Sequence, residues 1–335
     1  MLQQTRVETV LPFYTRFLER FPTVEDLAAA GIEEVLAQWS GLGYYRRARQ
    51  LHAAARQVAA AGEGFPRTLE GLLALPGVGA YTAAAVASIA FQVPAPVMDG
   101  NVERVLSRCL ASEEDPKTSG PRRKLLAAAA ELLDPVRPGD SNQALMELGA
   151  TLCSPRRPKC LLCPLRPGCR ASAEGDPERY PSARAKRETE RHRLLVAVVE
   201  DGSGVLLFRR PDDSPLLAGT WELPWVNVER DGVASGEAPE AGLAGRYGGR
   251  WSVGPRLARV RHGITFRDIE VDVHRAELCW GGEVREGEAG WFGERQRADL
   301  PLSSLVGKVL GALVTLGTAG ASAAAPARRS PSRRR

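Results

Sequence analysis

Four cysteines crowd into one short stretch near the middle of the chain. Cys153, Cys160, Cys163 and Cys169 follow the spacing C-x6-C-x2-C-x5-C. Four thiols this close converge on one centre when they ligate a metal, and zinc and a [4Fe-4S] cluster are the two candidates. Zinc sites usually pair two C-x2-C hooks across a longer gap, whereas a single compact loop with unequal spacings favours the cluster. The sequence therefore predicts a metal-binding loop at 153–169.

The length and charge of the chain limit its number of domains and its kinds of partner. A chain of 335 residues exceeds the usual size of one domain, so we expect two. The net charge of +5 fits a polyanionic partner without requiring one. No run of about 18 apolar residues is present, and MLQQTRVETV at the start lacks the apolar core of a signal peptide. We expect a cytoplasmic protein, in which cysteine clusters bind metals and disulfides are rare.

The pattern of the chain changes after the cysteines. Residues 1–172 are rich in Ala and Leu at helical spacing, and Pro and Gly punctuate them, which predicts an all-α domain. Residues 173–190 are polar, charged and proline-bearing, which is typical of a linker. We expect a second domain at 191–315 and a disordered basic tail at 316–335, more typical of a solvated appendage than of a non-specific DNA contact.

Short β-like runs characterise the second domain. They are RLLVAVVE, GVLLFRR, TWELPWV, ARVRHGITF and RDIEVDVHRAEL, and the last of them shows alternation at Ile269, Val271 and Val273. Alternation of this kind indicates strands with one face buried, so we expect a mixed α+β domain built on a sheet.

The string LPGVG predicts a hairpin between two helices. Its members Leu75, Gly77, Val78 and Gly79 are followed by the Ala-rich run AYTAAAVASIA, which restarts a helix. Backbone N–H groups at such a helix start point outward and can bind a phosphate. A structural helix-turn-helix corner can use the same residues.

Asp99 lies between an apolar segment and a helix that we expect to start near Asn101. By itself this position is typical of a turn or a helix cap. The order of LPGVG, VMDGNVERVLSR and the cysteine loop, however, resembles that of the helix-hairpin-helix DNA glycosylases of the endonuclease III superfamily. This resemblance implies a [4Fe-4S] cluster on the four cysteines and makes Asp99 the catalytic aspartate, with Asn101 as its partner. A carboxylate there stabilises the oxocarbenium-like sugar that forms when a base leaves.

Tyr81 stands two residues after LPGVG. Superfamily members that nick DNA through a Schiff base carry lysine at this position, because an amine must attack the sugar. A phenol cannot form an imine, so we expect a monofunctional enzyme; a simple packing role is the alternative for this tyrosine.

Three further strings resemble the MutY-type adenine (A/G-specific) glycosylases: LQQTRVETV at 2–10, GLGYYRRARQLH at 41–52 and NQALMELGATLC at 142–153. The resemblance implies that Gln4, Thr5, Leu42 and Tyr44 probe oxidised guanine and wedge the duplex, and that Gln143 contacts the adenine. Flipping a base out of the stack leaves a hole that such side chains fill. The arginines at 46, 47 and 49 are plausible phosphate contacts or a solvated helix face.

The second domain resembles the Nudix-like C-terminal domain of the same family, notably in LLAGTWELPW at 216–225. It lacks the glutamate-rich REUxEExGU helix that holds Mg²⁺ in Nudix hydrolases, so we expect binding without hydrolysis. Family members contact the oxidised guanine with Phe-Ser-His. Thr265 can replace the serine hydroxyl here, whereas Phe266 cannot donate as a histidine would.

The resemblance places the family's general-acid glutamate two residues before Met1, and we expect the natural protein to extend upstream. The expected fold is a mostly α helix-hairpin-helix glycosylase domain with an iron-sulfur cluster loop, followed by an α+β Nudix-like domain. The expected activity is hydrolysis of the N-glycosidic bond of adenine mispaired with 8-oxoguanine or guanine in double-stranded DNA, by a monomer. Two alternatives remain open: a non-catalytic lesion-binding protein and an endonuclease III-like glycosylase for oxidised pyrimidines.

Overall fold

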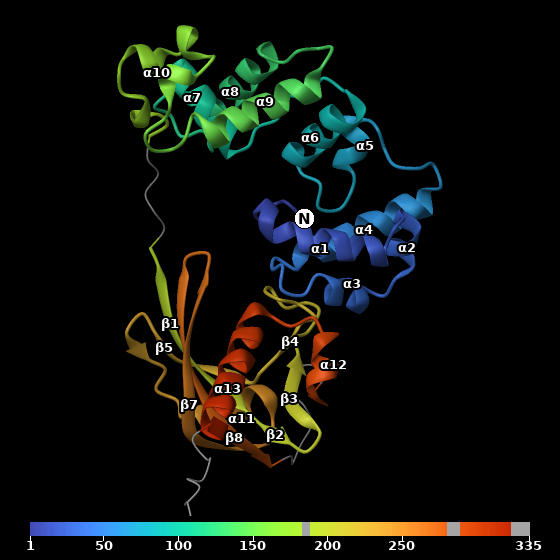
Figure 1. Cartoon of the computed structure of the whole chain (residues 1–335), viewed down its shortest axis with the longest axis vertical. Helices are drawn as coiled ribbons and strands as arrows, with labels where there is room; N and C mark the ends of the chain where they lie inside the picture. Colours follow the sequence, from blue (N-terminus) through green and yellow to red (C-terminus); the bar gives the residue numbers. More distant parts are fainter. Residues whose placement is uncertain (183–187, 280–288, 323–335) are drawn as a thin grey trace, which may run out of the picture. The chain divides into compact units, whose positions relative to one another are not determined.

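The computed structural model describes residues 1–182, 188–279 and 289–322, with side chains to 315. Contacts divide the chain into two compact units (Figure 1). The bipartite unit consists of Met1–His52 together with Arg187–Arg335, and the central unit is Ala53–Lys186. No helix in the described residues combines the length and the apolar character that crossing a membrane requires.

Short helices open the bipartite unit. They are α1 (Val7–Arg20), α2 (Val24–Ala29), α3 (Ile32–Gln38) and the first residues of α4 (Arg46–Ala61). The start of α2 is fixed by a capping box, in which the Thr23 side chain accepts from the Asp26 N–H and the Asp26 carboxylate accepts from the Thr23 N–H. Phe17 of α1 packs edge-on against buried Trp39, which closes this small helical cluster.

A five-stranded sheet forms the body of the same unit, with strand order β6-β5-β1-β8-β7. The central strands β1 and β8 run parallel, and the other pairs are antiparallel. A smaller sheet has the order β2-β3-β4, with β9 paired to β3. The elements are β1 (Glu190–Val198), β2 (Glu200–Asp201), β3 (Gly204–Arg209), β4 (Trp221–Glu222), β5 (Trp225–Arg230), β6 (Val233–Ala234), α11 (Pro239–Tyr247), β7 (Arg250–Ile264), β8 (Arg267–Cys279), β9 (Ala289–Phe292), α12 (Glu294–Ala298) and α13 (Ser304–Ser322).

Alternation along the strands explains how the large sheet is covered on both faces. Ile269, Val271 and Val273 of β8 point into one core, which they share with Val306 and Val309 of α13. The opposite face packs against α11 in a second core formed by residues such as Leu195, Leu243 and Tyr247. Because β1 lies at the centre, its residues 194–198 are buried on both faces. The expected α+β class is confirmed, as is the alternation predicted for β8.

The N-terminal helices belong with the sheet in this structure, which differs from the domain that we predicted over 1–172. The Tyr45 hydroxyl donates to the carbonyl of Leu302, and the Ser40 hydroxyl accepts from the Leu302 N–H at 3.2 Å. Arg49 donates to Asp212 Oδ1 and to the carbonyl of Ala218, both at 3.0 Å. These contacts join residues at least 163 positions apart, so no local sequence pattern predicts them.

The central unit is helical. It contains the rest of α4, followed by α5 (Leu69–Leu73), α6 (Ala80–Phe91), α7 (Gly100–Leu110), α8 (Ser119–Glu131), α9 (Pro138–Thr151), η1 (Cys160–Leu162), η2 (Arg166–Gly168), α10 (Arg170–Ala173) and η3 (Pro177–Arg179). Two glycines let α9 lie against its neighbours without a gap. A Cβ at Gly149 would approach Asn101 of α7 to 2.7 Å, and one at Gly139 would approach the carbonyl oxygen of Ser88 in α6 to 2.8 Å.

Two predicted stretches contain structured residues. In the linker expected at 173–190, the carbonyl of buried Tyr180 accepts from Arg108, and Ser182 donates to the carbonyl of Glu113. In the tail expected from 316, α13 continues to Ser322. Residues 323–335 of the predicted tail lie outside the described residues.

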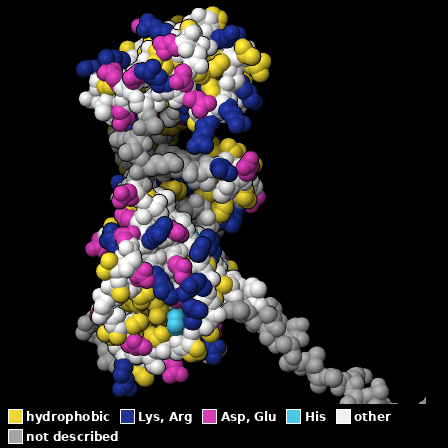
Figure 2. All heavy atoms as spheres, turned by 90° about the vertical axis from the view of Figure 1, so that its left-hand side faces the viewer, with side chains coloured by type: hydrophobic (Ala, Val, Ile, Leu, Met, Phe, Trp, Pro, Cys, Tyr) yellow, Lys and Arg dark blue, Asp and Glu magenta, His cyan; other side chains and the backbone are white. Residues whose placement is uncertain are grey.

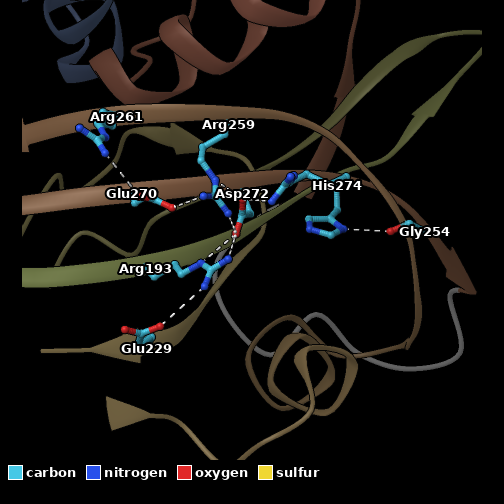
Figure 3. Close-up of polar contacts among 9 residues, drawn as sticks. Arg193, Glu229, Gly254, Arg259, Arg261, Glu270, Asp272 and His274 are labelled. Carbon is cyan, nitrogen blue, oxygen red and sulfur yellow. Dashed lines mark hydrogen bonds and ion pairs between the residues drawn. The ribbon is translucent and has the colours of Figure 1, made fainter. Parts of the chain in front are cut away.

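Asp272 organises a charged cluster on the α11 side of the large sheet (Figure 3). Its carboxylate is 6% exposed and accepts from Arg193 at 2.9 Å, Arg259 at 2.8 Å and Arg256 at 3.2 Å. Burial alone would raise the pKa of Asp272, but the hydrogen bonds from Arg259 and Arg193 outweigh it and hold the pKa below its usual value. Elsewhere on the surface basic and acidic side chains are interspersed, as the face in Figure 2 shows.

We expect Asp272→Asn to lower the free energy of unfolding at pH 7 by about 2 to 4 kcal/mol, because it leaves three arginines around a neutral group. The lowered pKa means that Asp272 contributes stability above the unfolded pKa of about 3.9 and loses it as pH falls through the folded pKa. Urea unfolding at pH 7 and at about pH 3 measures both effects. Glu229→Gln is the control, because the Glu229 side chain is 39% exposed and lies 3.7 Å from Arg193. An equal loss of unfolding free energy in both variants would contradict the prediction.

Candidate active site

The predicted hairpin is present between α5 and α6. Gly77 has φ of 76°, a left-handed conformation that favours glycine, and the Val78 N–H closes the turn on the carbonyl of Leu75 at 3.2 Å. Leu75 is buried and anchors the turn, whereas Gly77 and Gly79 are exposed. Gly79 caps α6 without a side chain, so the cap residue makes no side-chain hydrogen bond to the first N–H groups of that helix.

Asp99 is the N-cap of α7, as its local pattern predicted. Its Oδ1 accepts from the Val102 N–H at 2.7 Å, and its Oδ2 accepts from Asn101 Nδ2 at 3.2 Å. The carboxylate is half-buried. Its orientation is therefore fixed by one backbone donor and one side-chain donor, and part of its surface stays accessible. The structure brings the predicted pair Asp99 and Asn101 into direct contact.

A buried asparagine holds the extended segment that leads to Asp99. Asn142 of α9 accepts from the Val97 N–H at 3.1 Å and donates to the carbonyl of Ala95 at 2.8 Å and to the Ser88 hydroxyl at 2.9 Å. All of its amide groups are used within the protein interior. Sequence reasoning singled out the neighbouring Gln143 and missed this residue.

Tyr81 and Gln143 both lie on exposed helix surface of the central unit. The Tyr81 hydroxyl reaches from α6 to Met146 Sδ of α9 at 3.5 Å, one turn from Gln143. Partial burial raises the pKa of Tyr81, and the nearby charge of Asp99 raises it further. Tyr81 therefore stays a neutral phenol within electrostatic range of Asp99. Gln143 donates to the carbonyl of Gly139 in its own helix at 3.2 Å, which leaves its amide oxygen pointing outward for another donor.

Arg104 connects the start of α7 to the cysteine loop. It donates to Asn101 Oδ1 at 2.9 Å, to the carbonyl of Gly149 at 2.6 Å and to the carbonyl of Cys153 at 2.8 Å. A continuous hydrogen-bonded path thus runs from the first motif cysteine through Arg104 and Asn101 to Asp99. Two arginines four residues apart on one helix, 104 and 108, were the signal in the sequence that would have pointed to this role.

Arg108 holds the loop itself. It is 2% exposed and donates to the carbonyls of Tyr180, Ser154 and Pro155 at 3.1, 2.7 and 3.0 Å. One of its terminal nitrogens also lies 3.3 Å from Cys153 Sγ. A buried arginine with this many carbonyl acceptors fixes the path of the loop.

All four motif cysteines line one hollow, together with apolar residues such as Val105, Leu148 and Leu165. The predicted ligands therefore share one site, whereas their binding of a cluster stays a prediction. Among the described side chains, no three of His, Cys, Asp or Glu form a group that could hold a single metal ion. Four thiols around one hollow are the donor set that iron-sulfur clusters use.

The two remaining cysteines, Cys109 and Cys279, lie in different surroundings. Cys279 is exposed at the end of β8. Cys109 lines the same hollow as the motif cysteines, and burial, together with the neighbouring Cys169, raises the pKa of its thiol to about 12. Burial also raises the pKa of Cys163. Burial in this hollow therefore disfavours the thiolate forms of Cys109 and Cys163.

The predicted DNA-probing residues of the bipartite unit are grouped at two adjoining loops. Gln4 and Tyr44 are exposed and both have left-handed backbones, with φ of 62° and 51°. Thr5 lies beside Gln4 and binds Arg47 at 3.0 Å. Leu42 departs from expectation, because it is only 5% exposed and supports the turn from the interior.

Thr265 lies at the tip of the hairpin between β7 and β8, where its φ is 55°. It is exposed, and its hydroxyl donates to the carbonyl of Ile264 at 2.7 Å. The hydroxyl can therefore still accept a hydrogen bond from an incoming group.

Comparison with known proteins adds to this geometry. Residues 1–131 match the model of the HhH-GPD superfamily base excision DNA repair proteins. The adenine DNA glycosylase of Arabidopsis thaliana is 42% identical over 69% of this chain and 42% of its own length. The chain spans about half the length of the curated relatives it matches.

Two solved structures are similar to part of this chain. A thermostable thymine-DNA glycosylase is 31% identical, with a TM-score of 0.48, and covers 52% of this chain and 80% of that one. The C-terminal domain of mouse MUTYH, solved in complex with human PCNA, is 24% identical, with a TM-score of 0.30, over 41% of this chain and 91% of that one.

Proposed function

We propose that this chain is an adenine DNA glycosylase, because residues 1–131 match the HhH-GPD superfamily model and an adenine DNA glycosylase is 42% identical over 69% of the chain. The proposed substrate is double-stranded DNA in which adenine is mispaired with 8-oxoguanine or guanine. The reaction adds water to C1′ of the sugar, breaks the N-glycosidic bond and leaves an abasic site with free adenine. The observation that carries the proposal is the half-buried carboxylate of Asp99, fixed at the start of α7 beside Tyr81.

Asp99 supplies the electrostatic part of the mechanism. When the base leaves, the sugar becomes an oxocarbenium-like cation, and a fixed carboxylate stabilises that charge without reorganising. The bonds from Val102 and Asn101 occupy one lone pair on each oxygen, so the carboxylate keeps accepting capacity toward a ligand. Arg104 and Gly149 hold Asn101 in place from the other side.

In this proposal, the hairpin and the cysteine loop bind the DNA. The N–H groups at the start of α6 bind one phosphate, and the exposed basic residues of the loop, such as Arg156 and Lys159, bind others. Gln143, exposed on α9, reads the flipped adenine through its amide. Thr265 offers its hydroxyl to the opposite base.

Cys153, Cys160, Cys163 and Cys169 would hold a [4Fe-4S] cluster in the hollow that they line. Such a cluster cross-links the loop, and its charge offsets that of the thiolates. The loop that it braces carries the phosphate-binding residues and, through Arg104, contacts the helix of Asp99.

The proposal is tested by single-turnover release of adenine from a duplex with adenine opposite 8-oxoguanine. The protein is produced from its reading frame with any codons upstream of Met1 retained. We expect free adenine and an abasic site, with no strand cleavage before alkali treatment.

The alternatives give different products. Because Tyr81 cannot form an imine, no covalent complex should be trapped by borohydride; a trapped complex with cleavage opposite an oxidised pyrimidine would support an endonuclease III-like enzyme. Tight binding to the mispair with no release of any base would support a lesion-binding protein.

A further inference from the structure

We propose that Arg47 is a positioning residue that clamps the loops at 1–5 and 40–44 in the conformation that presents Gln4 and Tyr44 to DNA. This inference rests on the proposed function for what the two loops do. It changes the role of Arg47 from the phosphate contact or solvated residue suggested by the sequence to an internal support.

The guanidinium of Arg47 bonds to both loops at once. One terminal nitrogen donates to the carbonyls of Met1, at 2.6 Å, and Gln3. The other donates to the Thr5 hydroxyl at 3.0 Å and to the carbonyl of Gly43 at 3.1 Å. Each terminal nitrogen of an arginine carries two N–H groups, so these four bonds use all of them. No terminal N–H is left for a DNA phosphate.

Two aromatic rings complete the clamp. The guanidinium carbon lies 5.4 Å from the ring centre of Trp39 and 5.2 Å from that of Tyr44. Trp39 is buried and its indole N–H also donates to the carbonyl of Gly43, at 3.0 Å. Arg47 itself lies in the first turn of α4, so the clamp is attached to a regular helix.

Backbone strain explains why a clamp is needed here. Gln4 and Tyr44 are both non-glycine residues in the left-handed region, with φ of 62° and 51°. Such a conformation costs on the order of 1 kcal/mol per residue and persists only where the surroundings impose it. Both residues are solvent-exposed, and the Tyr44 ring packs against the Arg47 guanidinium itself. The bonds from Arg47 to residues 1, 3, 5 and 43 lie on both sides of the strained positions.

The experiment compares Arg47→Met, Arg47→Lys and Arg56→Met. Arg56 is an exposed arginine of the same helix, and its variant measures the loss of one charge alone. Three properties are measured: amide hydrogen exchange over residues 2–5 and 40–45, fluorescence of 2-aminopurine placed beside the mispaired adenine, and the single-turnover rate of adenine release. Circular dichroism and thermal unfolding confirm that each variant is folded.

We expect Arg47→Met to exchange the amides of both loops at least tenfold faster, to lose the fluorescence increase that reports unstacking, and to release adenine about 10- to 100-fold more slowly. Arg47→Lys should behave in the same way, because one ammonium cannot span four separated acceptors. Arg56→Met should match the parent protein.

Rescue by lysine, with a fall of about one in the salt dependence of binding for Arg47→Met, would overturn the clamp in favour of a phosphate contact. Unchanged exchange in both loops would overturn it as well. If the parent protein released no adenine, the proposed function would fail, while hydrogen exchange would still decide whether Arg47 holds the loops.

Discussion

Asp99→Asn is expected to reduce single-turnover adenine release by at least about 1,000-fold while duplex affinity stays within about tenfold. Asparagine caps a helix as well as aspartate does, so the bond from the Val102 N–H survives and α7 keeps its start. The negative charge that opposes the developing sugar cation is lost, together with the hydrogen bond that Asp99 Oδ2 accepts from Asn101. The substitution therefore distinguishes the role of Asp99 as a helix cap from its role in stabilising the sugar cation.

Two further variants make this result specific. Asp99→Ala removes both charge and cap, so it should lose activity equally and also about 1 kcal/mol of stability. Asp134→Asn alters a carboxylate that accepts from the backbone N–H groups of Val136 and Arg137 in the same unit, and it should release adenine at the parent rate. If Asp99→Asn kept turnover near that of the parent, Asp99 would be a helix cap and nothing more.

Cys163→Ser is expected to strip the metal from the protein and to lower its unfolding midpoint by about 5 to 15 °C. Cys163 supplies one of the four motif thiols that line the hollow, and its loss leaves only three of the four thiolates that would hold the cluster. Iron and sulfide analysis should give about four of each per chain for the parent protein and much less for the variant. Adenine release should fall with them, because the loop held by Arg108 carries the basic residues proposed to bind phosphates.

Cys279→Ser is the matched control, because this cysteine is exposed and lies on β8, outside the hollow. It should keep both metal and stability. Zinc in place of iron, without sulfide, would contradict the cluster and revive the zinc alternative. Iron retained at the parent level in Cys163→Ser would exclude Cys163 from the ligand set.

Features of the site that depend on sequence neighbours could be predicted from the sequence. Contacts between residues far apart in the chain could not. The turn at Gly77, the cap at Asp99 and the alternation in β8 each depend on neighbouring residues, whose types reveal them. The support of Asn101 by Arg104 and of the 93–98 segment by Asn142 depends on packing between helices, which composition does not encode. The same limit applies to Arg47, which the sequence shows only as one arginine among three.

The domain boundary illustrates the same point at a larger scale. A change in composition near 172 was visible, but the bonds of Ser40 and Tyr45 to Leu302 join residues more than 250 positions apart. No periodicity or turn signal connects such positions. Resemblance to a family supplied roles for single residues, such as Leu42, and the structure then showed which of them are at the surface.

The cap at the start of α7 has a genetic consequence. Aspartate and asparagine codons differ by one base, so a single substitution can produce the Asp99→Asn protein in nature. Because asparagine preserves the helix start, quality control would find no misfolded chain to remove. Under the proposed function, the inactive protein would accumulate at normal levels and bind mispairs from which it cannot excise adenine. An allele of this kind would act by shielding damage from other repair proteins, and it would be harsher than deletion of the gene.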